Sequence, residues 1–108
     1  GIANFAPEIS LSLLKAAHRE DYKEVREILK VLQPLFRFRR KISTSHGTST
    51  TILPEGYTAS YDWLGVLKEA MNMVGLCGGV PRLPILPLRS EYKEELRKIL
   101  VDMGLPVK

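Results

Sequence analysis

The sequence has few of the side chains that carry out covalent or metal chemistry. Among 108 residues there are one cysteine, Cys77, and two histidines, His18 and His46. A single thiol cannot close an internal disulfide, which predicts a cytoplasmic location or another reducing compartment such as the mitochondrial matrix. A zinc ion takes four ligands, or three and a water molecule, and these three scattered residues show no metal-motif spacing. We therefore expect no metal ion and no cofactor.

The sequence also lacks long apolar runs and a strong excess of charge. No uninterrupted apolar stretch approaches the length of a membrane span, and the first residues do not have the pattern of a signal peptide. The net charge is +4, which equals the charge of one cluster, Arg37, Arg39, Arg40 and Lys41. Outside this cluster, the numbers of acidic and basic residues are equal. The hydrophobic share of 44% is ordinary for a soluble protein, and this length predicts one domain with one modest core.

Two amphipathic helices are predicted in the first half of the chain. Pro7 is typical of a first helical turn, and the pattern of that helix breaks at His18. Asp21 is a good N-cap for a second helix, which fades after Lys41. Because only a few residues join the two helices, we expect them to lie antiparallel. Pro34 falls inside the second helix and predicts either a kink or a restart there.

Two more helices are predicted in the second half. The third begins near Tyr61 or Asp62 and stops at Gly75, and the fourth is capped by Ser90 and stops at Gly104. The apolar spacing of the four helices predicts these buried stripes: Ile9, Leu13 and Ala17 with Leu14 beside them; Tyr22, Val25, Leu29, Leu32 and Phe36, widened by Ile28 and Leu35; Trp63, Leu67, Ala70, Met71 and Val74; and Tyr92, Leu96, Ile99, Leu100 and Met103.

The segment between the second and third helices has a different composition. Residues 43–60 are rich in serine, threonine and glycine and contain one formal charge, at Glu55. Such residues bury little apolar surface, so we expect a mobile loop or a lid, with Thr50–Leu53 able to form a short extended piece. The predicted fold class is therefore all-α, with about four helices and one long polar loop.

The residues that could carry chemistry all have a structural explanation that we favour. Cys77 forms no recognisable cysteine–histidine signature with His18 or His46, so we expect it to act as a small buried hydrophobe. Gly78 and Gly79 are followed by prolines rather than by the start of a helix, which indicates a tight turn and not a phosphate-binding loop.

The lysines do not have the environment that an imine requires. A lysine that forms a Schiff base must be desolvated or crowded by other cations, so that it is uncharged at neutral pH. Lys68 lies near an apolar stripe, but Glu69 is its neighbour. The other lysines that we considered fall on charged helix faces: Lys15, Lys23, Lys30, Lys93 and Lys98. We assign no catalytic, cofactor-binding or metal-binding residue.

The segment Phe36–Lys41 alternates aromatic and basic residues, and two interpretations remain open. Cations that neutralise phosphate and rings that stack on bases are typical of a nucleic-acid contact. The interpretation that we favour is the end of a helix, where cations offset the negative end of the helix dipole and the phenylalanines belong to the core.

Four motifs follow one another in an order that resembles one enzyme family. They are Asn4–Glu8, Gln33–Leu35, Val66–Leu76 and Gly79–Pro84, each next to or inside a predicted helix. This order resembles the C-terminal part of the dihydrodipicolinate synthase and N-acetylneuraminate lyase family. The resemblance implies a Schiff-base lyase or aldolase that acts on pyruvate or a related 2-oxo acid, built as a (β/α)8 TIM barrel with a C-terminal helical domain.

The resemblance also implies how the chain divides. Residues 1–19 would be the end of the last barrel strand and the last barrel helix, and residues 20–108 the C-terminal helical domain, with a loop insertion at 43–60. The lysine, tyrosine and threonine-rich turn that the family uses lie upstream, so no catalytic position is carried over and the fragment alone is expected to be inactive. Arg82 and Pro84 match a recurrent family pattern, to which we give a structural role.

The resemblance implies that this portion serves packing and oligomerisation. The expected partners are the rest of the barrel or other copies of the chain, in a homo-oligomer, and a pyruvate-type substrate binds only in the parent. The stripe of Ile9, Leu13 and Leu14 should need such a partner, so we expect the isolated chain to self-associate through its first helix. We expect no membrane partner. The alternative is a free-standing basic helical module that binds nucleic acid or an acidic protein through Phe36–Lys41.

Overall fold

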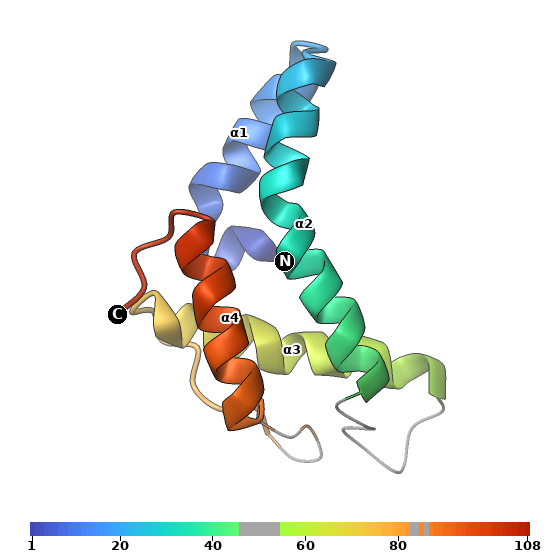
Figure 1. Ribbon diagram of the computed structural model, residues 1–108, viewed down its shortest axis with the longest axis vertical. Helices are drawn as coiled ribbons and strands as arrows, with labels where there is room; N and C mark the ends of the chain where they lie inside the picture. The colour runs from blue at the N-terminus through green and yellow to red at the C-terminus, as the bar shows by residue number, and fades with distance from the viewer. Residues whose placement is uncertain (46–54, 83–84, 86) are drawn as a thin grey trace.

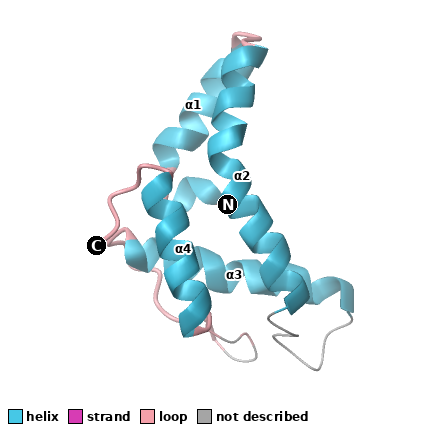
Figure 2. Cartoon of the chain, viewed as in Figure 1, coloured by secondary structure: helices cyan, strands magenta, loops and turns pink. Residues whose placement is uncertain are grey.

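The structure is a computed structural model that describes residues 1–45, 55–82, 85 and 87–108, with side chains outside 43–45 and 55–62. It contains a short 3-10 helix, η1 (Ile2–Asn4), and four α-helices, α1 (Pro7–His18), α2 (Tyr22–Ser45), α3 (Glu55–Met73) and α4 (Ser90–Asp102) (Figure 1). No strand occurs among the described residues, which confirms the predicted all-α fold (Figure 2). None of the described helices has the length and apolar character needed to cross a bilayer.

A helical hairpin projects from a three-helix body, and the whole measures 44 × 31 × 20 Å (Figure 1). α1 runs antiparallel along the N-terminal half of α2, as the short connection between them predicts. The C-terminal half of α2 packs against α3 and α4, which also contact each other. We call residues 7–31 the hairpin arm, and residues 32–45 together with α3 and α4 the body.

The hydrophobic core lies mainly in the body. The side chains of Leu32, Leu35 and Ile42 on α2 are almost fully buried, and Leu96 and Leu100 on α4 meet them as predicted. Two residues that precede α1 join this cluster, so the start of the chain is anchored to the body. The complete core is Phe5, Ala6, Leu32, Leu35, Phe38, Ile42, Val66, Ala70, Met73, Leu88, Leu96, Leu100 and Met103.

The buried face of α2 is rotated from the predicted one. The prediction that Tyr22, Leu29 and Phe36 are buried is wrong, because these side chains are 64%, 37% and 40% exposed. The apolar face of α2 is wider than the surface that its neighbours cover, so one flank of it remains open. Sequence periodicity locates the apolar face but does not show which part of it has a partner.

α1 is less covered than its sequence predicts. Ala16 is its one buried residue, and Ile9 and Leu13 are half-buried. The prediction that Ala17 is buried is wrong, since its side chain is exposed, and Leu14 is 54% exposed. α1 has α2 on one side, and its opposite side faces outward.

α3 and α4 end at the predicted glycines. Gly75 and Gly104 have φ angles of 84° and 79°, the left-handed region that glycine adopts without steric cost. After α3, the amide of Gly75 donates to the carbonyl of Asn72 at 3.1 Å, and that of Leu76 to the carbonyl of Met71 at 2.8 Å. This pair of bonds is a Schellman motif, which satisfies carbonyl groups at the end of a helix.

The predicted helix caps have different outcomes. The Asp21 carboxylate accepts a hydrogen bond from the amide of Glu24 at 3.0 Å, which confirms it as the cap of α2. The prediction that Ser90 caps α4 is wrong, because Ser90 is the first helical residue and no side chain caps this helix. The N-cap is Arg89, whose backbone is extended and whose carbonyl accepts the amides of Tyr92 and Lys93.

The helices around the predicted polar loop are longer than expected. α2 continues to Ser45 and α3 begins at Glu55, so the predicted boundaries of the loop at 43–60 and of the third helix at Tyr61 or Asp62 are wrong. Adding a residue to an existing helix costs far less than starting one, so a helix anchored by its packed part extends into polar sequence. Residues 46–54, with His46 and the extended piece predicted for Thr50–Leu53, lie outside the described residues.

Two backbone features bear on the resemblance. Pro34 lies inside a continuous α2, so the alternative of a restarted helix is wrong. Ile2–Asn4 form η1, whereas the resemblance implies the end of a barrel strand at this place. The amides of Asn4 and Phe5 donate to the carbonyls of Gly1 and Ile2 at 3.2 and 3.1 Å. These local hydrogen bonds satisfy backbone groups that have no neighbouring strand among the described residues.

Glu20, the second residue after α1, provides a test of how this helix ends. Glu20 has a φ angle of 58°, and its amide and that of Asp21 donate to the carbonyls of Ala17 and Ala16, both at 3.0 Å. This is the Schellman position that favours glycine, so Glu20→Gly should raise the free energy of unfolding by about 0.5–1 kcal/mol. Glu20→Ala keeps the β-carbon and is the matched control. Urea denaturation that shows no gain for glycine over alanine would contradict this prediction.

Candidate functional site

The single thiol lies outside any site. Cys77 follows α3 in the body and its side chain is exposed, so the prediction of a small buried hydrophobe is wrong. The chain turns outward at Leu76 and Cys77, and Gly78 returns to pack on α3 in their place. His18 ends α1 at the tip of the hairpin arm, away from the thiol (Figure 1). Among the described residues, no group of three or more metal-binding side chains is placed to hold an ion.

Two side chains of α3 hold the segment that contains the paired glycines. The Asn72 side chain donates to the carbonyl of Gly79 and accepts from its amide, both at 2.9 Å. The Lys68 ammonium donates to the carbonyl of Gly78 at 2.9 Å. We call these four residues the glycine clasp. Gly78 and Gly79 lie in irregular backbone after the turn at Val74 and Gly75, so the tight turn predicted at these two glycines is not confirmed. The clasp gives Lys68 a structural partner where the sequence alone showed only a lysine beside an apolar stripe.

Only glycine fits at position 78 of the clasp. A β-carbon on Gly78 would lie 2.1 Å from the backbone oxygen of Lys68 and 2.9 Å from the side-chain oxygen of Asn72. Gly79 has open space around it, but its φ angle of 67° lies in the left-handed region. Sequence analysis missed Asn72. The available signal was its position one helical turn after Lys68, facing the glycines that follow the helix.

The basic cluster lies inside α2 and not at its end. Because the helix continues to Ser45, the interpretation of these cations as partners of the helix dipole is wrong. The Arg39 guanidinium lies 5.0 Å from the centre of the Trp63 ring on α3. The Lys41 ammonium lies 2.6 Å from the Glu95 carboxylate on α4, and this hydrogen bond raises the pKa of Lys41. Both cations therefore join α2 to a neighbouring helix.

The two phenylalanines of the cluster have different environments. Phe38 is 2% exposed and meets the Tyr92 ring edge-on, with 6.4 Å between ring centres. Phe36 is 40% exposed on the open flank of α2. Phe38 thus confirms the predicted core role, whereas Phe36 does not. Rings and cations do not form one stacked row, the arrangement that a single-stranded nucleic-acid contact would use.

The lysines considered for imine formation are all accessible to water. Every lysine of the chain is described and is exposed or half-buried. Lys30 pairs with Glu27 at 2.8 Å, and Lys93 on α4 pairs with Glu69 on α3 at 3.3 Å. None of these lysines therefore has the buried environment that a Schiff-base lysine requires.

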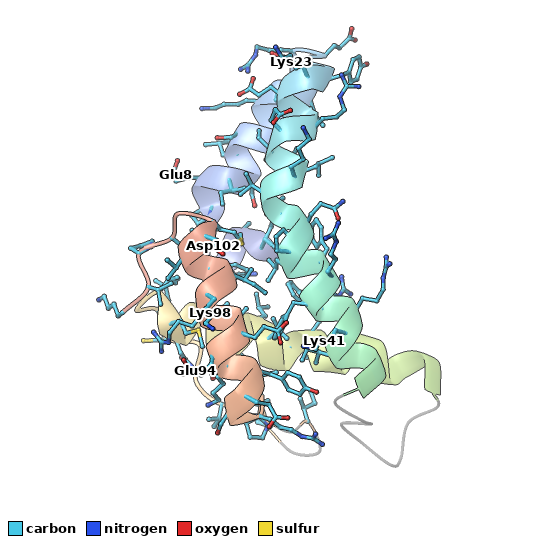
Figure 3. The ribbon with its side chains drawn as sticks, viewed as in Figure 1. Glu8, Lys23, Lys41, Glu94, Lys98 and Asp102 are labelled. Atoms are coloured by element: carbon cyan, nitrogen blue, oxygen red, sulfur yellow. The ribbon has the colours of Figure 1, made fainter. Side chains whose placement is uncertain are left out.

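Two grooves lie on the surface of the described part of the molecule. One, of 460 Å³, lies between α2 and α4, where its charged residues have both signs (Figure 3). It is lined by Pro34, Arg37, Phe38, Lys41, Glu95, Lys98, Ile99 and Asp102. The second, of 230 Å³, lies at the base of the hairpin arm and is mostly apolar. It is lined by Glu8, Ile9, Ser12, Ile28, Val31 and Met103. Neither lining includes a cysteine or a histidine.

Several apolar side chains of the hairpin arm are exposed to water. Leu11, Leu14 and Val31 are 45%, 54% and 44% exposed, and Leu29 adds to them. A hairpin two helices thick buries the side chains between its helices but leaves its outer faces open. Leu11 and Leu14 are three residues apart on α1 and are therefore neighbours on its outer face.

The two phenylalanines of α2 give a matched pair for a stability test. Phe38→Ala should lower the free energy of unfolding by about 3–5 kcal/mol, because it empties a buried site in the core. Phe36→Ala should cost about 1 kcal/mol or less, since its ring is partly in water. Thermal or urea unfolding followed by circular dichroism measures both. Equal losses in the two variants would refute the assignment of Phe38 to the core and Phe36 to the surface.

The glycine clasp gives a second stability test. Gly78→Ala should destabilise the protein by about 1–3 kcal/mol, because the new methyl group must push α3 and the turn apart. Gly79→Ala is the control, with a cost of about 1 kcal/mol from its left-handed backbone alone. If Gly79→Ala has a lower denaturant midpoint than Gly78→Ala, the close contact of Gly78 with α3 is not the reason for glycine at position 78.

Comparison with known proteins gives matches that share one name. The 4-hydroxy-tetrahydrodipicolinate synthase of Natronomonas pharaonis is 30% identical over 101 residues, which are 94% of this chain and 28% of that protein. The protein of the same name from Methanocaldococcus jannaschii is 28% identical over 104 residues, 96% of this chain and 29% of that protein. That from Caldicellulosiruptor bescii is 50% identical over 42 residues, 39% of this chain and 14% of that protein.

The chain thus spans less than a third of the length of these curated relatives, although it is matched over nearly all of its own length by two of them. No family model matches the chain, and no solved structure matches it significantly. The shared name of the relatives confirms what the ordered motifs indicated: this chain resembles a part of the dihydrodipicolinate synthase family.

Proposed function

We propose that the chain is the C-terminal helical portion of a Schiff-base lyase or aldolase of the dihydrodipicolinate synthase type. In this proposal residues 1–19 end the barrel, residues 20–108 form the appended helical domain, and the parent acts on pyruvate or a related 2-oxo acid. The portion itself serves packing and assembly and not turnover. The observation that carries the proposal is a match over nearly the whole chain that covers under a third of each relative.

The uncovered surface of the hairpin arm supports the packing role. Leu11 and Leu14 point outward from α1, and the half-buried Ile9 and Leu13 are covered by α2 on one side only. The last helix of a (β/α)8 barrel packs its apolar stripe against the sheet, and the described residues of this chain include no strand. The open side of α1 has the apolar character that such a contact requires.

The contacts of the lysines support the absence of turnover. Imine formation requires a neutral amine beside a bound 2-oxo acid, and the described lysines are hydrated, paired with carboxylates or bonded to a backbone carbonyl. The alternative, a nucleic-acid module, is disfavoured because Arg39 and Lys41 are used in contacts between helices and Phe38 is in the core.

Borohydride trapping tests the proposed inactivity. The 108-residue chain is incubated with pyruvate and sodium borohydride, which reduces an imine to a stable adduct, and its intact mass is measured. We expect no adduct, while a full-length 4-hydroxy-tetrahydrodipicolinate synthase treated in parallel should be labelled. Labelling of this chain at one lysine, abolished by arginine at that position, would overturn the proposal.

The mass of the native protein tests the parent. If the chain is the C-terminal portion of a barrel enzyme, the protein isolated from its source should be much larger than 12.2 kDa, with these residues at its end. Peptide mapping of that protein by mass spectrometry should place residues 1–108 after a longer upstream sequence. A native protein of the size of this chain would refute the proposal.

A further inference from the structure

After α4 the chain turns back and runs to the end of α3 (Figure 1). Gly104, with a φ angle of 79°, makes this turn, because glycine adopts the left-handed conformation without steric cost. Leu105 and Val107 then pack, half-buried, against the core. We call residues 104–108 the strap.

Lys108 connects the strap to both α3 and α4. Its amide donates at 2.8 Å to the carbonyl of Met73, one of the last carbonyls of α3, which have no partner inside the helix. Its side chain lies against Gly75, where a β-carbon would be 2.7 Å from the ammonium nitrogen. Its carbonyl accepts from the Arg97 guanidinium on α4 at 2.6 Å. Glycine at position 75 therefore ends α3 and also makes room for the strap.

The glycine clasp is attached to the same end of α3. The side chain of Asn72 holds the backbone of Gly79 through two hydrogen bonds. The next residue along the helix is Met73, whose carbonyl holds the strap. Gly75 follows two residues later and contacts the strap directly. The strap and the clasp thus depend on one helical turn.

We propose that the strap and the glycine clasp open and close together, as one coupled unit at the end of α3. Release of the strap takes the Lys108 side chain away from Gly75 and leaves the Met73 carbonyl to water. This loosens the turn of α3 that positions Asn72. Release of the clasp, in turn, lets the chain after Gly75 move and removes the surface on which Lys108 lies. A coupling of this kind is reciprocal by thermodynamic necessity.

The unit is built to open without the body. The bonds between Asn72 and Gly79 and the bond from Arg97 to the strap all lie at exposed positions. The apolar side chains of the strap are half-buried, whereas Leu35 in the body is fully removed from water. Segments with exposed hydrogen bonds and few buried apolar contacts open at a small fraction of the global free energy of unfolding.

The coupling gives the end of α3 a means to transmit a binding event. Anything that binds the chain after α3 in its closed state would also keep the strap closed, and the reverse holds as well. The unit consists of contacts within this chain alone. It therefore goes beyond the proposed function and does not depend on the reaction of the parent.

Hydrogen exchange followed by NMR tests the coupling at single amides of the full chain. Arg97→Ala removes a bond of the strap, and it should speed exchange of the Gly79 amide in the clasp about five- to tenfold. Asn72→Ala removes bonds of the clasp, and it should speed exchange of the Lys108 amide in the strap by a similar factor. Lys98→Ala is the matched control, since Lys98 is next to Arg97 but lines the groove on the α2 side of α4. It should leave both amides unchanged.

Amides around Leu35 report on the body and should exchange at the same rate in all three variants. If Arg97→Ala leaves the Gly79 amide unchanged, or Asn72→Ala leaves the Lys108 amide unchanged, the two segments open independently and the proposal is wrong. An equal increase at the Leu35, Gly79 and Lys108 amides would show that the segments open only with the body, which also overturns it. None of these results alters the borohydride outcome, so this inference and the proposed inactivity fail separately.

Discussion

Burial of the C-terminal half of α2 is the interaction on which the rest of the molecule depends. Leu32, Leu35 and Ile42 are almost completely removed from water, and α3 and α4 both pack on this part of the helix. A cation on each side closes the junction, with Arg39 over the Trp63 ring and Lys41 on Glu95. The charged residues that look from the sequence like a binding patch thus support the core, and Phe38 belongs to it.

The elements of this fold were predictable because the sequence marks them locally. Glycines at positions 75 and 104 and the carboxylate of Asp21 end or begin helices through bonds to the nearest backbone, and all three predictions are confirmed. The start of α3 at Glu55 was missed although Pro54 and Glu55 form a local helix-start signal like that of Pro7 and Glu8, because the polar composition of residues 43–60 was given more weight. The buried side of α2 depends on where distant helices lie, so periodicity alone placed Leu29 and Phe36 on the wrong side of the boundary.

For the candidate site, the sequence mainly predicted which kinds of chemistry are not expected. With one thiol and two histidines, the sequence shows that little nucleophilic or metal chemistry is available, and the structure adds that Cys77 and His18 lie in different parts of the molecule. The glycine clasp was only partly predictable: the position of Asn72 one helical turn after Lys68 was a usable signal, but its contact with Gly79 also depends on how the chain returns after α3. The exposed apolar side of α1 needed the structure as well, since only burial separates the half-buried Ile9 side from the exposed Leu11 side.

The sparse burial of α1 has a consequence for how the molecule fluctuates. With Ala16 as its one buried residue, this helix can leave α2 while the core of the body stays intact. Amide hydrogens of residues 7–18 should then exchange with solvent through a small local opening, whereas those around Leu35 require cooperative unfolding of the body. The part of the chain suited to meet another surface is also the part that opens at the lowest free energy.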